Sequence, residues 1–419
     1  MASFNSTNFL SAMKHMYPIK KVENLVYKNN PLLAMIPKNT SFPGRNATYA
    51  VEYGMTHGRS ATFATAQANR TGTLLKDFVV TRVKDYAIVS VDNETLLAAD
   101  GSEGSLLDVA KSKTDSALHA LSRAMGRDIY RSGTGAIAQL SNPGDGTSVA
   151  SNVVTLTSGG TLQIEVGMRL KGSATDGSVL YDGVVTVESV DRKAGTFKTT
   201  VAPGTSMSSL GDADFLYVEG DAANAGANIK MAGIDSWLPS TVASSGDSHF
   251  GVDRYVDASR LGGQKIDFTD SSHVSTLIAG AVTVAREGGR PDKVFMNPAD
   301  WQELAMDMEG TVVKNQAYAR RRFDGDDTSA KFGFATVQLA SPAGMIDIVA
   351  DHNCPVGVCY MLQMDTWQFK SLGSAPRLLD FDGLKGLRQS NEDGVEYRWG
   401  YYGNLLCTAP GFNARIALA

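Results

Sequence analysis

Alternating apolar and polar residues mark a long hairpin near the start of the chain. The alternation runs over residues 47–53 and again over 79–91, the spacing of strands that bury one face. The twenty residues between them, 54–73, are almost all small or polar, and a loop of that length with no core of its own is uncommon. The pattern predicts a hairpin over 45–92 whose tip is either a disordered loop or a flap ordered on another subunit.

The most regular helical pattern follows at residues 105–132. Large apolar residues recur there at helical spacing: Leu107, Leu118, Leu121, Met125 and Ile129. Gly133 and Gly135 supply a stop signal. Such a helix is about 40 Å long, which suits a structural spine.

Residues 1–42 predict an arm rather than a domain. Its apolar positions form short clusters: Phe9, Leu10, Met13 and Met16, then Val22, Leu25 and Val26, and finally Leu32, Leu33, Met35 and Ile36. Prolines at 31 and 37 bound the last cluster. Because so short a segment has little core of its own, we expect it to pack on the rest of its chain or on a neighbour.

Residues 142–222 change character and predict a small inserted β-domain. Short strand candidates alternate with glycine-containing turns; they are 153–156, 163–170, 184–190, 196–201 and 215–218. This regular spacing favours a sandwich or barrel. The segment has few aromatic residues and more acids than bases, which argues against a nucleic-acid-binding barrel.

A mixed α/β segment follows a loop-rich stretch at 223–271. The patterns predict helices at 274–286 and 299–308, the second begun by Asn297 and Pro298. They predict strands at 293–296, 345–349, 356–361, 395–407 and 414–418. The segment at 395–407 is the longest of these strands.

Composition narrows the class of protein. The chain has 419 residues, 43% of them hydrophobic and 20% charged, which indicates a folded chain of two or three domains. Its net charge of −5 argues against a protein that holds nucleic acid by neutralising phosphates. There is no secretory signal pattern and no apolar run of about 18 residues, so no transmembrane helix is expected. Three cysteines are too few for a disulfide framework, and an odd number cannot all pair within one chain. This favours a protein that folds in a reducing cytosol.

Motifs that carry chemistry are absent from the sequence. It has no phosphate-binding loop, dinucleotide fingerprint, nucleophile elbow or zinc-protease motif. His352, Cys354 and Cys359 are the nearest approach to a metal cluster, but a fourth ligand is not evident. Two acidic clusters lack the later glutamate of a calcium loop: Asp324, Asp326 and Asp327, and Asp380 and Asp382. We therefore expect no catalytic, cofactor or metal residues.

Basic residues are the candidates for contacts between subunits. Arg59 and Arg70 are the only charged residues of the flap, and Lys76 is the nearest lysine. The run Arg320, Arg321 and Arg322 directly precedes an acidic stretch. A charge run is usually a solvated face, and a subunit contact is the functional alternative.

The order of these parts resembles that of a major capsid protein of tailed phages, with the α+β Hong Kong 97-type fold. Three stretches carry the resemblance: 30–33 in the arm, 291–298 with Trp301, and 394–398 with 403–407 in the closing strand. It covers nearly the whole chain apart from the insertion. The order of the motifs along the chain is the main support for the resemblance.

The resemblance implies a virion shell of pentamers and hexamers, assembled in the bacterial cytoplasm around double-stranded DNA that is not bound sequence-specifically. It implies an N-terminal arm at 1–42, an extended loop at 43–80, a peripheral domain at 81–141 and 365–419, an axial domain at 223–364, and the insertion outside the shell. Implied partners are copies of the chain itself, a portal protein and, because the sequence starts directly in the arm, a separate scaffolding protein. The flap has no lysine for a covalent cross-link, so a cement protein is a possible further partner.

Three other functions remain open at this point. An encapsulin-like compartment has the same fold but encloses cargo enzymes. An α/β enzyme with an attached β-domain would need a catalytic motif that the sequence does not display. A tail or baseplate protein would be structural as well.

Overall fold

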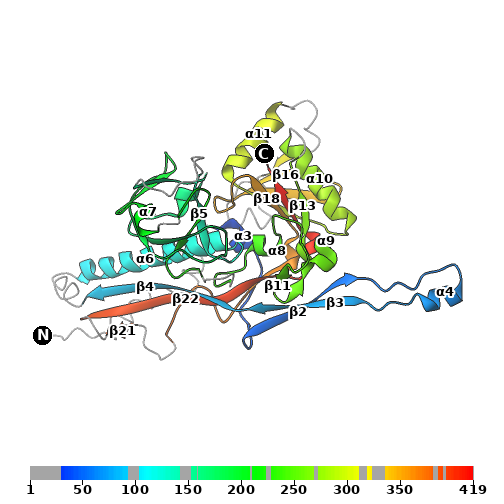
Figure 1. Cartoon of the computed structure of the whole chain (residues 1–419), viewed down its shortest axis with the longest axis horizontal. Coiled ribbons are helices and arrows are strands. Elements are labelled where there is room, and N and C mark those ends of the chain that lie inside the picture. Colours follow the sequence, from blue (N-terminus) through cyan, green and yellow to red (C-terminus); the bar gives the residue numbers. More distant parts are fainter. Residues whose placement is uncertain are drawn as a thin grey trace.

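The subunit is elongated, and its parts follow one long axis (Figure 1). A hairpin projects at one end, a long helix lies along two strands at the other, and a mixed sheet with two helices stands between them. This computed structural model describes residues 30–92, 103–141, 152–157, 159–207, 210–222, 228–268, 272–310, 319–322, 336–380, 386–389 and 393–418. Among the described helices, none is long and apolar enough to cross a membrane.

The central sheet has seven strands of mixed direction. Their order is β13 (Gln264–Ile266), β23 (Ala414–Ala417), β18 (Val358–Leu362), β14 (Lys293–Met296), β17 (Gly344–Ala350), β16 (Thr336–Ser341) and β15 (Ala319–Arg322). The pairs β13–β23 and β14–β17 are parallel, and the other pairs are antiparallel. Helix α10 (His273–Arg286) packs on the sheet through a buried apolar face, and α11 (Pro298–Gly310) packs beside it.

A second sheet is built around the longest strand, β22 (Gly394–Cys407). Its members are β1 (Lys38–Asn39), β19 (Trp367–Ser371), β20 (Arg377–Leu378), β21 (Leu387–Arg388) and β4 (Val83–Asp92). Helix α6 (Glu103–Asp128) is the predicted spine and packs against β4 and β22. Leu118 and Met125 on its inner face are fully buried. The helix ends at Asp128, before the predicted end, and the buried Ile129 and Tyr130 follow outside it.

The projecting hairpin consists of β2 (Asn46–Gly54) and β3 (Leu74–Thr81). They pair antiparallel from Asn46 opposite Thr81 to Gly54 opposite Leu74. The prediction that the return strand continues to residue 91 is wrong, because β4 leaves the hairpin after Arg82 and pairs with β22. Alternation specifies which face of a strand is buried but not the strand with which it pairs. The same alternation therefore continues from β3 into β4, although the two strands pair with different partners.

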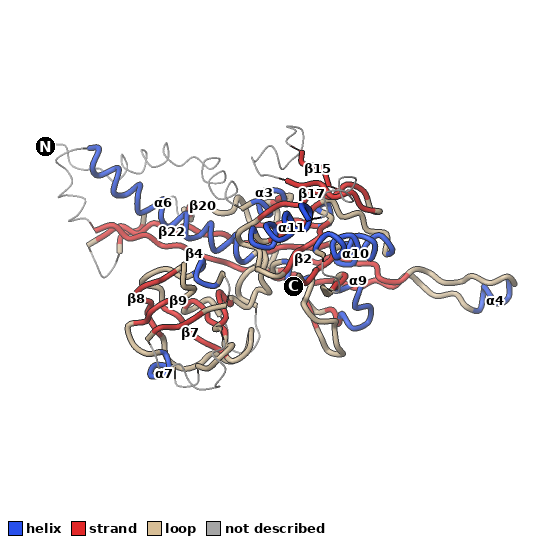
Figure 2. The backbone as a smooth tube through the Cα atoms, turned by 90° about the horizontal axis from the view of Figure 1, so that it is seen from above, coloured by secondary structure: helices blue, strands red, loops and turns tan. Residues whose placement is uncertain are grey.

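The inserted β-domain forms a six-stranded sheet with its own apolar core. Its strands in order are β5 (Ala136–Gln139), β10 (Phe215–Val218), β7 (Arg169–Ser173), β8 (Val185–Asp191), β9 (Thr196–Thr199) and β6 (Val153–Thr155). Strand β5 lies ahead of the range 142–222. Two short helices, η1 (Gly160–Gln163) and α7 (Pro203–Ser206), complete the domain. Figure 2 shows it as a rounded body beside α6.

The predicted strand at 163–170 is wrong over most of its length. Residues Gly160–Gln163 form the 3-10 helix η1, and strand β7 begins only at Arg169. Glycines explain the break, because Gly159 and Gly167 have φ angles of 78° and 86°, which a continuous strand does not adopt.

The described part of the arm packs on its own chain. Helix α3 (Pro31–Met35) buries Leu32 and Leu33 completely, in a core shared with the hairpin root, α6 and β22. The first two apolar clusters of the arm lie outside the described residues. Short connecting elements complete the fold: α4 (Phe63–Ala68), α8 (Ile234–Trp237), β11 (Ser248–His249), β12 (Val252–Asp253), η2 (Arg254–Asp257), α9 (Ala258–Gly262), η3 (Met364–Thr366) and η4 (Pro410–Phe412).

Candidate assembly surfaces

The tip of the hairpin is held by its own hydrogen bonds. The backbone amide of His57 donates to Thr71 Oγ1, and the amide of Thr71 donates to the His57 carbonyl, each at 2.8 Å. Helix α4 lies beyond this ladder and buries none of its residues. Both views show the tip well beyond the body of the subunit (Figures 1 and 2). The flap therefore has a defined backbone but no core.

Large apolar side chains of the hairpin face solvent. Phe63 on α4 is 83% exposed, and Met55, directly after β2, is 68% exposed. Leu74 and Leu75 at the start of β3 are also exposed. Because the tip stands away from the body, no surface of the described part of the chain covers these side chains. A surface of this kind is typical of a contact with another molecule.

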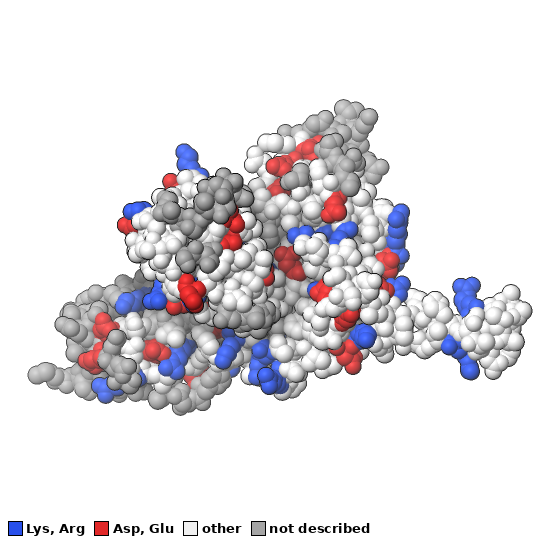
Figure 3. All heavy atoms as spheres, in the orientation of Figure 1, with Lys and Arg blue, Asp and Glu red and all other residues white. Residues whose placement is uncertain are grey.

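The charge at the tip is basic, as the sequence predicts. Arg59 and Arg70 are exposed, and Arg70 Nε donates to the Gln67 carbonyl at 3.1 Å. Figure 3 shows basic side chains and no acidic ones on the visible face of the tip. Lys76 lies on β3 opposite Val51 and is half-buried.

The remaining candidates lie elsewhere in the fold. Arg320, Arg321 and Arg322 belong to β15, which pairs with β16 at the end of the central sheet. The structure describes their backbone but not their side chains. It therefore brings Arg59 and Arg70 to one tip and places the arginine run on a different element.

The root of the hairpin is fixed by specific contacts. Phe78 of β3 is fully buried and packs against Trp237, with 5.2 Å between ring centroids. The amide of Val79 donates to the Phe250 carbonyl at 3.0 Å, and Arg260 Nη1 donates to the Tyr53 carbonyl at 2.7 Å. The body thus sets the direction in which the flap projects.

A buried histidine belongs to the same root. His249 lies 4.8 Å from Trp237 and 4.3 Å from Phe250 between ring centroids. Burial, with a smaller contribution from the nearby charge of Arg254, lowers the pKa of His249 well below its usual value of 6.5. The imidazole is therefore neutral in the folded subunit at neutral pH.

A hydrogen-bonded junction anchors the arm. Asn30 Nδ2 donates to the carbonyl and hydroxyl oxygens of Ser122 on α6, each at 3.2 Å. Asn353 Nδ2 donates to Asn30 Oδ1 at 2.8 Å, and Tyr130 OH donates to Asp351 Oδ2 at 2.8 Å. These contacts connect the arm, the spine helix and the loop after β17. No long-range signal in the sequence predicts these contacts, although Gly126, a glycine inside the helical pattern of the spine, lies next to them.

The cysteines and acidic clusters form no metal site in the described part of the chain. Cys354 and Cys359 are buried free thiols, and burial raises the pKa of each above its usual range. His352 is exposed beside them. Asp324, Asp326, Asp327 and Asp382 lie outside the described residues, and Asp380 is exposed.

Comparison with known proteins identifies the class. Residues 212–385 match the family model described as SU10 major capsid protein. This match covers less than half of the chain, and it supports the interpretation of the chain as a tailed-phage major capsid protein. Members of that family are structural components of the phage capsid. No curated protein matches the sequence.

Solved capsid structures share the fold of this chain. The capsid asymmetric unit of cyanophage A-1(L) superimposes with a TM-score of 0.53 at 12% identity, covering 93% of this chain and 92% of that one. A chain of Mycobacterium phage Bobi gives a TM-score of 0.41 at 11% identity, covering 93% and 91%. The first of these establishes the α+β fold of the Hong Kong 97 type over nearly the whole chain.

Proposed function

We propose that this capsid protein builds an icosahedral shell of pentamers and hexamers in which the hairpin reaches over a neighbouring subunit. The exposed apolar tip carries this proposal. Fully burying a phenylalanine such as Phe63 contributes about 1.5–3 kcal/mol, and a closed shell repeats that contact at every subunit. The root of the hairpin is held by the body of the subunit and its tip is exposed, so the tip is available for a contact with another subunit.

The basic residues of the tip have a role in orientation. Arg59 and Arg70 contact acidic surface of the neighbour, which sets register and specificity more than affinity. Arg320, Arg321 and Arg322 of β15 contact acidic surface of a neighbouring subunit in the same way. The mild net negative charge fits a container that encloses double-stranded DNA without gripping it.

Each region of the chain has its own position in the shell. Residues 43–80 form the extended loop, 81–141 and 365–419 the peripheral domain with its spine, and 223–364 the axial domain at the capsomer centre. The insertion, with a core of its own, stands on the outside. A separate scaffolding protein directs assembly, a portal protein occupies one vertex, and a cement protein is the further partner.

The test is a deletion of residues 54–73, closed with a short turn. A subunit that remains monomeric, folded and as stable as the parent, but forms no closed shells, is the expected result. Replacing the same residues with a Gly/Ser segment of equal length is the matched control, since it keeps the reach of the flap but removes its side chains. Normal shells from both variants would contradict the role of the flap.

A further inference from the structure

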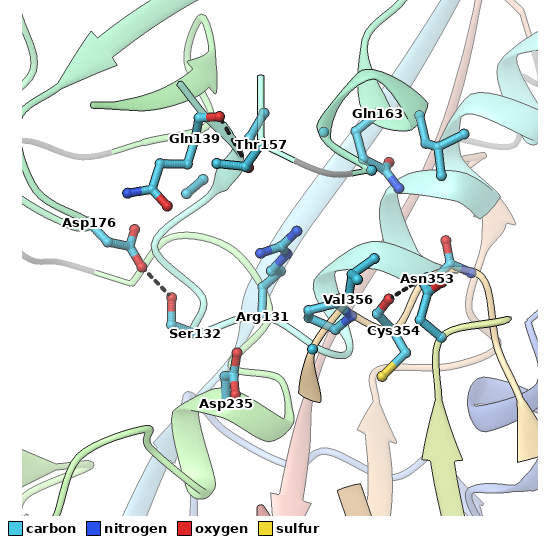
Figure 4. A pocket seen from close by; sticks show the side chains of 18 of the residues that line it. Arg131, Ser132, Gln139, Thr157, Gln163, Asp176, Asp235, Asn353, Cys354 and Val356 are labelled. Carbon is cyan, nitrogen blue, oxygen red and sulfur yellow. Dashed lines mark hydrogen bonds between the residues drawn. The ribbon is translucent and has the colours of Figure 1, made fainter. Parts of the chain in front are cut away.

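A cavity lies at the joint between the inserted domain and the body (Figure 4). Its volume is about 670 Å³. Phe215 and Gln163 line it from the insertion, and Arg131, Asp235 and Val356 line it from the body. Sites for small ligands have volumes of about 300–1,000 Å³ and combine apolar walls with a few polar groups, and this cavity has both features.

Arg131 is a cavity residue whose side-chain Nε has no hydrogen-bond partner within the described part of the chain. It follows the end of the spine helix, and its side chain extends into the cavity (Figure 4). The same Nε is buried. Burial raises the pKa of Asp235, and the positive charge of Arg131 helps to offset that rise, but no hydrogen bond joins the two side chains. A buried polar group without a partner is costly, and a guanidinium is the side chain best suited to hold a carboxylate or phosphate in two parallel hydrogen bonds.

The two carboxylates of the cavity already have donors from their own chain. Asp235 accepts from Tyr360 OH at 2.7 Å and from Arg415 Nε at 3.1 Å. Asp176 accepts from Ser132 Oγ at 3.0 Å, and Thr134 and Tyr217 donate to its other oxygen at 2.5 and 3.2 Å. Arg131 therefore interacts with Asp235 through its charge only, and its guanidinium retains hydrogen-bond donors that a ligand can reach.

The insertion contributes a further donor. The side-chain amide of Gln163, in η1, faces the cavity and makes no hydrogen bond within the described part of the chain. Arg131 and Gln163 lie on opposite sides of the joint. We propose that the cavity binds an oxyanion group, a phosphate or a carboxylate, held between Arg131 of the body and Gln163 of the insertion. Such a ligand fixes the inserted domain relative to the body.

Isothermal titration of the purified subunit tests this site. Inorganic phosphate and acetate are titrated separately in a low-salt buffer free of other oxyanions. We expect saturable binding of at least one of them at one site per subunit. Phosphate alone indicates a phosphate-bearing ligand, and acetate binding indicates a carboxylate. Arg131→Gln is expected to weaken binding at least about tenfold, because it removes a charge-assisted hydrogen bond.

Two further variants separate binding from folding. Gln163→Ala, on the other side of the joint, is expected to weaken binding by a smaller factor and remains informative if Arg131→Gln does not fold. Arg169→Gln is the matched control, because Arg169 pairs with Glu219 on the surface of the insertion. Absence of saturable binding to either anion, or binding that is unchanged in both Arg131→Gln and Gln163→Ala, would overturn the proposal.

Discussion

Asn353 Nδ2 donates a 2.8 Å hydrogen bond to Asn30 Oδ1 across 323 positions of sequence. Both side chains are buried, at 6% and 3% exposure. The bond joins the arm to the loop that follows β17, and Asn30 also bonds to Ser122 of the spine. One asparagine thus connects three separate parts of the subunit.

Asn30→Ala is expected to lower the free energy of unfolding of the unassembled subunit by about 1–3 kcal/mol, because it removes the acceptor of the buried Asn353 side-chain amide. Urea denaturation measures this change. Asn39→Ala is the control; the Asn39 side chain accepts from the amide of Ser41 at an exposed site, so a change within about 0.5 kcal/mol is expected. Equal effects of the two substitutions would show that the junction does not anchor the arm.

Gly126→Ala tests the close approach of the arm to the spine. A Cβ at this position would lie 2.1 Å from Asn30 Oδ1 and 2.9 Å from Asn353 Nδ2. Alanine usually stabilises a helix by about 1 kcal/mol relative to glycine, but here the clash reverses the sign. We expect a net loss of stability of about 1–3 kcal/mol, the size of the hydrogen bonds displaced. Gly72→Ala, where a Cβ meets nothing within 4 Å, is expected to change little. A stabilised Gly126→Ala subunit would contradict this contact.

Phe63→Ser separates folding from assembly. Because Phe63 is 83% exposed, the subunit is expected to keep its unfolding free energy within about 0.5 kcal/mol. Each lost contact costs about 1.5–3 kcal/mol in the shell, so the yield of shells is expected to fall sharply. Sedimentation of the assembly reaction measures that yield. The control is Val166→Ser, at a residue of the insertion that is 65% exposed. Full assembly of Phe63→Ser would mean that the tip is not a contact.

The burial of His249 makes the stability of the subunit depend on pH. Its pKa is lowered by burial, so below its usual value of 6.5 the unfolded chain binds a proton that the folded subunit does not. Stability therefore falls as the pH drops below about 6.5, with a slope of at most about 1.4 kcal/mol per pH unit from this group. Urea denaturation over this range is expected to show a smaller slope for His249→Gln. His57→Gln, at the exposed tip, is expected to keep the slope of the parent. An unchanged slope in His249→Gln would assign the pH dependence to other groups.

The sequence predicts elements well where a local pattern is long. Strand β22 is predicted at 395–407 and found at Gly394–Cys407, and helix α10 is predicted at 274–286 and found at His273–Arg286. Short buried strands carry too few residues to establish a period, and β5 and β19 were missed for that reason. A local sequence pattern indicates the type of an element and its buried face, whereas the strands that pair with it depend on the whole fold.

The functional surface was predictable only in part. The flap was expected because residues 54–73 lack a core, and its basic charge follows from composition. The anchor between Asn30 and Asn353 was not predictable, since nothing local links residues so far apart. Gly126 was the available signal, because a glycine inside a helical pattern often marks a close contact. Arg131 gave no signal at all, since the missing hydrogen-bond partner of its Nε is a property of the folded cavity.

Negative-stain electron microscopy of the expressed chain, alone and with a co-expressed candidate scaffolding protein, tests the central claim most directly. A capsid protein is expected to form closed shells or capsomer rings under at least one of these conditions. The shell diameter would then bound the number of subunits. A monodisperse monomer under both conditions would contradict a role in the capsid.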